Sequence, residues 1–142
     1  MKRFVSYCWV ALLLFIFAII LLPINPRLTK RQFQNVKCRA EILNIATGIE
    51  KYRATYQEYP SREIPALCKQ LAGDNPQKLV LAAIKASSVN TNGELVDIWE
   101  MPYQIQFLQQ TNFIIHSAGE DKIFGTADDI VFNSVSNGFV KP

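Results

Sequence analysis

The sequence of 142 residues contains a single histidine and none of the short motifs that mark the commonest enzyme sites. It has no Gly-x-Ser-x-Gly nucleophile elbow, no glycine-rich phosphate loop, and no cysteine or histidine pair with the spacing of a zinc site. These absences argue against the usual hydrolases, nucleotide-binding enzymes and zinc proteins. We therefore expect a protein that is not an enzyme.

Charge is absent from residues 4–22, which read FVSYCWVALLLFIFAIILL and are followed by Pro23. A helix of this length would extend about 28 Å, close to the thickness of the hydrocarbon core of a bilayer. We therefore predict a transmembrane anchor in residues 1–26. A cleaved signal peptide is the alternative. Its apolar core would be roughly 7 to 15 residues long and would precede a small-x-small cleavage site, and no such site follows here.

Basic residues flank the predicted anchor on both sides, so the positive-inside rule gives conflicting orientations. Lys2 and Arg3 precede the anchor and favour a cytoplasmic N-terminus. Five basic residues follow it with no acidic residue between them, which favours the opposite orientation: Arg27, Lys30, Arg31, Lys37 and Arg39. The rest of the chain is close to neutral, and we expect no nucleic-acid partner.

Two of the three cysteines, Cys38 and Cys68, lie outside the predicted anchor, and Cys8 lies within it. Cys38 and Cys68 could form a disulfide in an exported domain, or both could be buried free thiols. We favour the free thiols. A catalytic thiol is disfavoured because the single histidine is far away in the sequence.

Apolar residues at intervals of three or four predict a long amphipathic helix from about residue 28 to 58, within a helical segment 27–60. The proposed apolar stripe consists of Phe33, Val36, Ala40, Leu43, Ala46, Ile49, Tyr52 and Tyr56. The helix should end before Tyr59-Pro60, because the residue before a proline is disfavoured in helical conformation. Its length would be about 45 Å. Most of the stripe should pack in the core, and its part nearest the membrane could pack on neighbouring copies.

The remaining residues, 61–142, should form a globular head. Residues 61–93 read as a helical insertion with helices at 66–72 and 77–87, the first starting after Pro65 and closed by Gly73. Residues 97–134 read as a sheet with an acidic loop. Its three strands are expected at residues 103–107, 113–116 and 130–132. An antiparallel three-stranded sheet packed on a long helix gives an α+β fold.

The loop 117–129 contains four of the twelve acidic residues. Gly119 and Gly125 permit sharp turns that turn backbone carbonyls inward. Carboxylates and carbonyls together are the ligands that Ca²⁺ prefers, although the spacing of an EF-hand is missing. The alternative is an ordinary solvated loop.

Two motifs carry a resemblance to a known family. The first is Asp97-x-Trp99-x-x-Pro102-Tyr103, and the second runs from Ser117-x-Gly119-x-Asp121 to Gly125-Thr126-x-Asp128-Asp129-Ile130. Together with Tyr52 and Tyr59-Pro60 at the end of the helix, they resemble the C-terminal half of the major pseudopilin of type II secretion systems. The resemblance implies a pilin-like fold and a calcium-binding loop. By position, the ligands would be the side chains of Asp121, Asp128 and Asp129 and the backbone carbonyls of Ala118 and Ile123.

The chain departs from that family at four places. No glycine precedes Phe4 to form a prepilin-peptidase site, and Cys8 occupies the position of the glutamate of the mature family members. Glu100 and Gln57 replace glycines of the family pattern. The first two departures argue against processing by the prepilin peptidase and against glutamate-guided docking into a fibre. We therefore expect a divergent relative.

These observations favour a membrane-anchored, pseudopilin-like structural or assembly protein. The family likeness implies a single-pass protein of the bacterial inner membrane with its head in the periplasm. It also implies self-association, or association with other pseudopilin-like proteins, through the N-terminal helix. One alternative is an anchored or secreted binding module that joins no fibre. Another is a calcium-dependent hydrolase using His116 and Asp121, although we expect His116 to be half-buried and hydrogen-bonded to the backbone.

Overall fold

The structure is a computed structural model that describes residues 26–108 and 112–140, with side chains from Lys30 onward. The chain divides into two units, residues 1–32 and 33–142, and the fold described below is that of the second. Within the described residues, no helix is long and apolar enough to cross a membrane. The predicted anchor at residues 4–22 and Cys8 lie outside the described residues.

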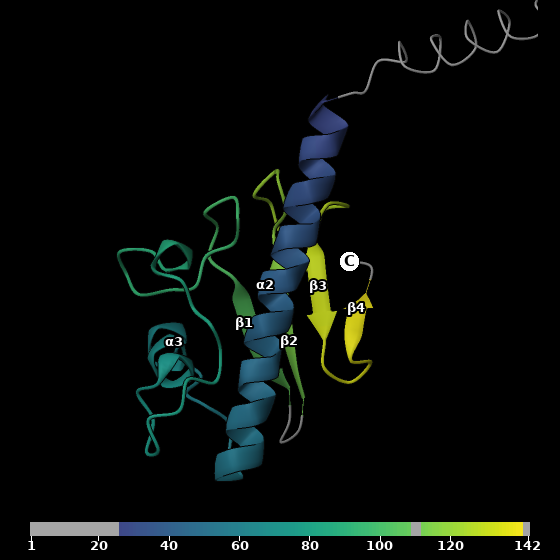
Figure 1. Cartoon of the computed structure of the whole chain (residues 1–142). Helices are drawn as coiled ribbons and strands as arrows, with labels where there is room; N and C mark the ends of the chain where they lie inside the picture. Colours follow the sequence, from purple (N-terminus) through teal and green to yellow (C-terminus); the bar gives the residue numbers. More distant parts are fainter. Residues whose placement is uncertain (1–25, 109–111, 141–142) are drawn as a thin grey trace, which may run out of the picture. The chain divides into compact units, whose positions relative to one another are not determined.

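The longest element is helix α2 (Pro26–Tyr56), which matches the predicted helix closely (Figure 1). It ends at a left-handed residue, Gln57, with φ +60°. The Gln57 backbone N–H still donates to the Arg53 carbonyl at 2.8 Å. The chain then leaves the helix before Pro60, as the sequence predicts.

The sheet has four antiparallel strands in the order β1-β2-β3-β4. They are β1 (Gln104–Leu108), β2 (Asn112–Ser117), β3 (Ile130–Asn133) and β4 (Gly138–Val140). The three predicted strands are confirmed, but the predicted strand number was wrong. The added strand β4 pairs Phe139 with Phe132 of β3 after a turn at Asn137, whose φ is +47°. Its three residues are too few to show alternation in the sequence.

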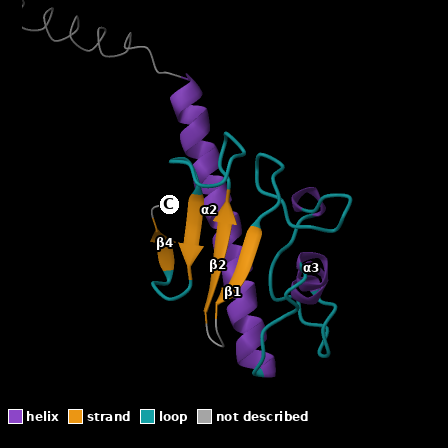
Figure 2. Ribbon diagram, turned by 180° about the vertical axis from the view of Figure 1, so that it is seen from behind, coloured by secondary structure: helices purple, strands orange, loops and turns teal. Residues whose placement is uncertain are grey.

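Helix α2 crosses one face of this sheet, as the opposite views of Figures 1 and 2 show. The core lies between them and includes Phe113, Ile115 and Phe132 from the strands. It also includes Trp99 and Tyr103, which are 8% and 4% exposed and occupy the core as the sequence analysis expects.

The predicted stripe of α2 is correct only in its second half. Ile49 and Tyr52 are buried, but Phe33, Val36 and Leu43 are 70%, 66% and 44% exposed. In the first half the core is contacted instead by Cys38, Ile42 and Ile45. The reason is helical geometry. Three residues turn a helix by about 300°, which is about 60° short of a full turn. The three successive steps of three residues from Leu43 to Tyr52 therefore rotate the stripe around the helix by about 180°.

Residues 61–103 lie on the side of β1, away from β4 (Figures 1 and 2). Helix α3 (Ile64–Ala72) is confirmed and ends at Gly73, whose φ is +122°. The predicted helix at residues 77–87 was wrong, because this segment is mostly irregular and contains only the short 3₁₀ helix η1 (Ala86–Ser88).

Asparagine side chains explain the irregular segment. Asn75 accepts a hydrogen bond from the Leu79 N–H at 2.9 Å and donates to the Leu79 carbonyl at 2.7 Å. Asn44 of α2 binds both backbone groups of Ala83. These side chains satisfy backbone groups that a helix would otherwise pair, and they favour an irregular path for the chain.

Cys38 and Cys68 are both buried and free, in agreement with the prediction. The Cys38 sulfur lies 3.6 Å from the Tyr103 hydroxyl. Burial raises the pKa of the Cys38 thiol to about 11, although hydrogen bonds from Ser117 and Tyr103 act in the opposite direction. This thiol is therefore protonated and unreactive near neutral pH.

Candidate functional site

The acidic loop joins β2 to β3 and is closed at its base by the pairing of Ser117 with Ile130. Gly119 has φ +71°, and a Cβ built at this position would lie 2.5 Å from the Asp128 carbonyl oxygen and 2.6 Å from its Oδ2. Only glycine can let the two ends of the loop approach this closely. Gly125 has φ +89° but has no atom within 4 Å of such a Cβ, so it serves the turn alone.

Three of the predicted calcium ligands surround one hydroxyl group. Thr126 Oγ1 lies 2.7 Å from Asp128 Oδ1, 3.4 Å from Asp129 Oδ1 and 3.2 Å from the Ile123 carbonyl oxygen. A hydroxyl group carries one hydrogen, so it can donate to only one of these acceptors at a time. The structure thus brings Asp128, Asp129 and the Ile123 carbonyl together around Thr126, a residue that the sequence analysis did not assign.

Asp121 lies beside this group. Its backbone N–H donates to Asp128 Oδ2 at 3.1 Å, and its own Oδ1 accepts from the Ile123 N–H at 2.8 Å. Partial burial raises the pKa of Asp128, but hydrogen bonds from Thr126 and Asp121 outweigh it and hold that pKa below its ordinary value. Asp128 is therefore ionised at neutral pH.

Asp129 is the most enclosed of the carboxylates, with its side chain fully buried. Its Oδ2 lies 2.6 Å from His116 Nε2 and accepts from the Gly125 N–H at 2.7 Å. The expected backbone partner of His116 was therefore wrong. The ring also packs edge-on against Phe124, with centroids 4.9 Å apart. The ring nitrogen pairs with Asp129 and not with Asp121, the partner that the hydrolase hypothesis named.

The last two predicted ligands are residues whose backbone carbonyls were assigned. Ala118 is fully buried next to Gly119, whereas Ile123 is 61% exposed at the outer turn of the loop. Across residues 26–108 and 112–140, no three histidine, cysteine, aspartate or glutamate side chains are grouped so as to hold a metal ion. The loop supplies oxygen donors of the kind that Ca²⁺ takes, but only two of its carboxylates converge, because Asp121 is bound to the Ile123 N–H of its own turn.

The two motifs of the sequence resemblance contact each other at the base of the loop. Asp97 is buried, and its Oδ2 accepts from the Ser117 hydroxyl at 2.6 Å. Its Oδ1 accepts from the backbone N–H groups of Trp99 and Met101, each at 2.9 Å. The Ser117 oxygen in turn accepts from the Gly119 N–H at 3.3 Å. Asp97 thus fixes the turn around Trp99 to the start of the acidic loop.

Both departures from the family's glycine pattern within the described residues fall at left-handed positions. Glu100 has φ +68° and Gln57 has φ +60°. Glycine adopts such values without strain, whereas other residues do so at a cost. The backbone therefore keeps the turn that the glycine pattern implies, although the side chains have changed.

Comparison with known proteins gives one structural likeness. No protein-family model matches the sequence, and no curated protein sequence matches it. The crystal structure of the major pseudopilin from the type 2 secretion system of enterohaemorrhagic Escherichia coli superposes with a TM-score of 0.50 at 22% identity. The match covers 78% of this chain and 96% of that chain. At this level of identity the likeness concerns the fold, and it agrees with the resemblance of the motifs. The chain has the pseudopilin fold.

Proposed function

We propose that this chain is a pseudopilin-like structural protein of the bacterial inner membrane. It assembles with copies of itself or with related pseudopilin-like proteins, and it carries its head on the periplasmic side. The support is the pseudopilin fold together with the apolar, uncharged segment 4–22 that precedes it. The protein acts by packing against its neighbours and catalyses no reaction.

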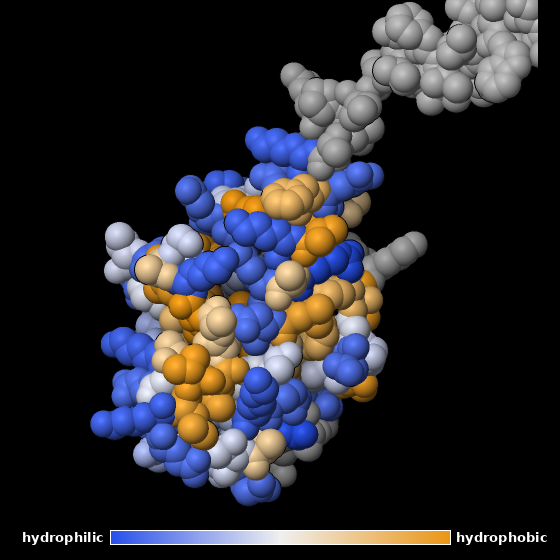
Figure 3. Space-filling model, viewed as in Figure 1, coloured by the Kyte–Doolittle hydropathy of each residue, from blue (hydrophilic) through white to orange (hydrophobic). Residues whose placement is uncertain are grey.

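The observation that carries the assembly proposal is an exposed apolar stripe on α2. Phe33, Val36 and Leu43 are 70%, 66% and 44% exposed and lie on the helix face opposite the core. Figure 3 shows apolar atoms among polar ones over the upper part of this helix. Further along the same face the residues become polar, at Thr47 and Lys51. Single exposed apolar residues are common, but three on one helix face within eleven positions favour contact with another helix.

A deletion experiment tests the role in secretion. Removal of the chain from its bacterium should abolish export of a type II substrate, and the wild-type chain should restore it. The double variant Phe33→Ser/Val36→Ser should fail to restore export, whereas Lys51→Ser, an exposed change beyond the stripe, should succeed. Normal export in the deletion strain would favour the alternative, an anchored binding module that joins no fibre.

A fusion experiment tests the orientation. Alkaline phosphatase, which becomes active only outside the cytoplasm, should be active when it is fused after Pro142. A reporter that is active at this position only in the cytoplasm would overturn the exported orientation and would agree with the basic residues that follow the predicted anchor.

We also propose that the acidic loop binds Ca²⁺ through the carboxylates of Asp121, Asp128 and Asp129 and the carbonyls of Ala118 and Ile123. The support is the convergence of three of these oxygens around Thr126 Oγ1 and the ionised state of Asp128. A bound Ca²⁺ would neutralise carboxylates that otherwise repel one another. Because Asp121 is bound to the Ile123 N–H, the loop must tighten to add its carboxylate to the other donors. The role is structural: it orders the connection between β2 and β3.

Thermal unfolding with and without a calcium chelator tests this site. At a free Ca²⁺ concentration one hundred times the dissociation constant, the stabilisation is about 2.7 kcal/mol. For a domain of this size that corresponds to about 10 °C in Tm. Asp128→Ala should abolish the response to Ca²⁺, whereas Glu120→Ala, which removes the same charge from the same loop, should keep it. A wild-type Tm that does not change on chelation would refute the calcium proposal.

A further inference from the structure

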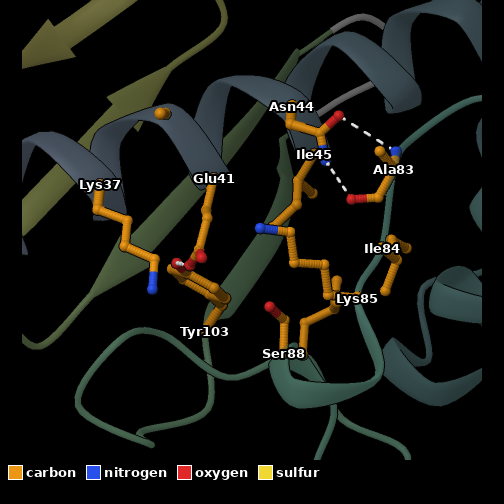
Figure 4. Close-up of a pocket in the computed structure, with 11 residues that line it drawn as sticks. Lys37, Glu41, Asn44, Ile45, Ala83, Ile84, Lys85, Ser88 and Tyr103 are labelled. Carbon is orange, nitrogen blue, oxygen red and sulfur yellow. Dashed lines mark hydrogen bonds between the residues drawn. The ribbon is translucent and has the colours of Figure 1, made fainter.

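A pocket of about 250 Å³ lies between α2 and residues 83–88 (Figure 4). Its floor is apolar and includes Ile45 of α2, which is 4% exposed, and Leu95, which is 1% exposed. An apolar floor of this kind stabilises a ligand that brings a hydrocarbon body.

The walls of the pocket are fixed before any ligand binds. Asn44 Nδ2 donates to the Ala83 carbonyl at 3.0 Å, and the Ala83 N–H donates to Asn44 Oδ1 at 3.2 Å. One turn further along α2, a Cβ built at Gly48 would lie only 2.8 Å from the Ala82 Cβ. The segment therefore contacts the helix closely at this end of the pocket, and the space beside it is preformed.

The mouth of the pocket carries two cations. Lys37 projects from α2, and Lys85 extends from the opposite wall toward the helix (Figure 4). Within residues 26–108 and 112–140, no ion pair involves either lysine. Glu41 is the one acid that lines the pocket, and its Oε2 accepts from the Tyr103 hydroxyl at 3.4 Å. Burial raises the pKa of Tyr103, so this hydroxyl stays neutral. The two lysines and Glu41 together leave an excess of one positive charge at the mouth.

We propose that this pocket binds a small carboxylate with an apolar body and about ten non-hydrogen atoms in all. The size follows from the volume, because a protein cavity of about 150 Å³ accommodates benzene. In this arrangement the hydrocarbon body lies on Ile45 and Leu95, and the carboxylate lies between Lys37 and Lys85. The carboxylate can belong to a free acid or to the C-terminus of a peptide that ends in an aromatic residue.

Phenylacetate and phenylacetamide, which share shape and size, test this proposal on the full chain in detergent. Binding is measured from the shifts of the backbone amide resonances of Ala83, Lys85 and Ser88. Phenylacetate should shift these resonances with a dissociation constant on the order of millimolar, as expected for so small a ligand. Phenylacetamide should bind more weakly, by roughly twofold to fivefold for each exposed charge contact that it loses.

Matched variants separate the roles of charge and shape. Lys37→Ala/Lys85→Ala should weaken phenylacetate binding by roughly fivefold or more, whereas Lys51→Ala/Lys69→Ala, with the same change of net charge outside the pocket, should leave it unchanged. Ala40→Leu should reduce binding of both probes by filling the pocket. Equal binding of acid and amide, equal effects of the two double variants, or the absence of shifts at Ala83, Lys85 and Ser88 would overturn the proposal.

The dipeptide N-acetyl-Gly-Phe and its C-terminal amide distinguish the two sources of the ligand. Binding of the free-carboxylate peptide and not of its amide supports the pocket and assigns it to a polypeptide terminus. Binding of phenylacetate alone supports the pocket and assigns it to a free acid.

Discussion

Replacement of Gly119 by alanine measures how tightly the acidic loop is closed. The new Cβ would lie 2.5 Å from the Asp128 carbonyl oxygen and 2.6 Å from Asp128 Oδ2, at a φ of +71°. The left-handed conformation costs a non-glycine residue about 1–2 kcal/mol. Overpacking against a backbone atom that cannot swing away costs a further 1–3 kcal/mol or so. Gly119→Ala should therefore destabilise the protein by about 2–5 kcal/mol.

Gly125→Ala is the matched control for this prediction. Gly125 also has a left-handed φ, +89°, but a Cβ there meets no atom within 4 Å. Its cost should be the conformational term alone, about 1–2 kcal/mol. Thermal unfolding followed by circular dichroism should show a loss of about 4 °C per kcal/mol in a domain of this size, so the two variants are readily separated. Equal losses of Tm for the two variants would refute the claim that the chain is closed tightly at Gly119 and Asp128.

Three further predictions concern other residues. Glu100→Gly and Gln57→Gly each remove the backbone strain of a non-glycine residue in the left-handed conformation, and each should stabilise the protein by as much as about 1 kcal/mol in urea unfolding. A loss of stability in either variant would contradict the strain argument. Burial raises the pKa of Cys38 to about 11 from 9.0, so the folded state keeps the proton longer than the unfolded state. The stability that the buried thiol contributes is complete below pH 9 and should fall by as much as about 3 kcal/mol as the pH rises to 11. Cys38→Ala should reduce this decline, and an unchanged pH profile of stability in this variant would refute the argument. Ser117→Ala removes the 2.6 Å hydrogen bond to the buried Asp97 and should cost about 1–3 kcal/mol in urea unfolding, whereas wild-type stability would show that the bond is dispensable.

The elements that the sequence predicts well carry strong local signals. Pro60 limits the long helix, Gly73 ends α3, and the alternation of Ile105 and Phe107 with glutamines marks β1. Each of these signals acts within a few residues, so it can be read without knowledge of the rest of the fold.

The elements that were wrong depend on contacts between distant residues. Leu79 and Val80 belong to the predicted helix at residues 77–87. They are instead 40% and 71% exposed on an irregular segment, because Asn75 and Asn44 bind its backbone. Strand β4 forms because Phe139 packs against Phe132 of β3. The sequence of a three-residue strand does not indicate this contact.

The contacts of the candidate calcium site are likewise of two kinds, local and distant in the sequence. Asp128 and Asp129 lie two and three residues from Thr126, so their contacts with its hydroxyl group are local, although the sequence analysis did not assign Thr126. The pairing of His116 with Asp129 spans thirteen residues and depends on the register of β2 and β3. No local pattern shows it, so the sequence analysis assigned His116 a backbone partner.

Site-specific photo-cross-linking in bacterial cells tests most directly the proposal that the protein assembles through α2. A photoreactive residue at position 36, on the exposed apolar stripe of α2, should give a ladder of dimers and higher multimers. The same residue at position 51, exposed on the same helix face beyond the stripe, should give the monomer. A monomer at both positions, or equal multimers at both, would contradict assembly through this stripe.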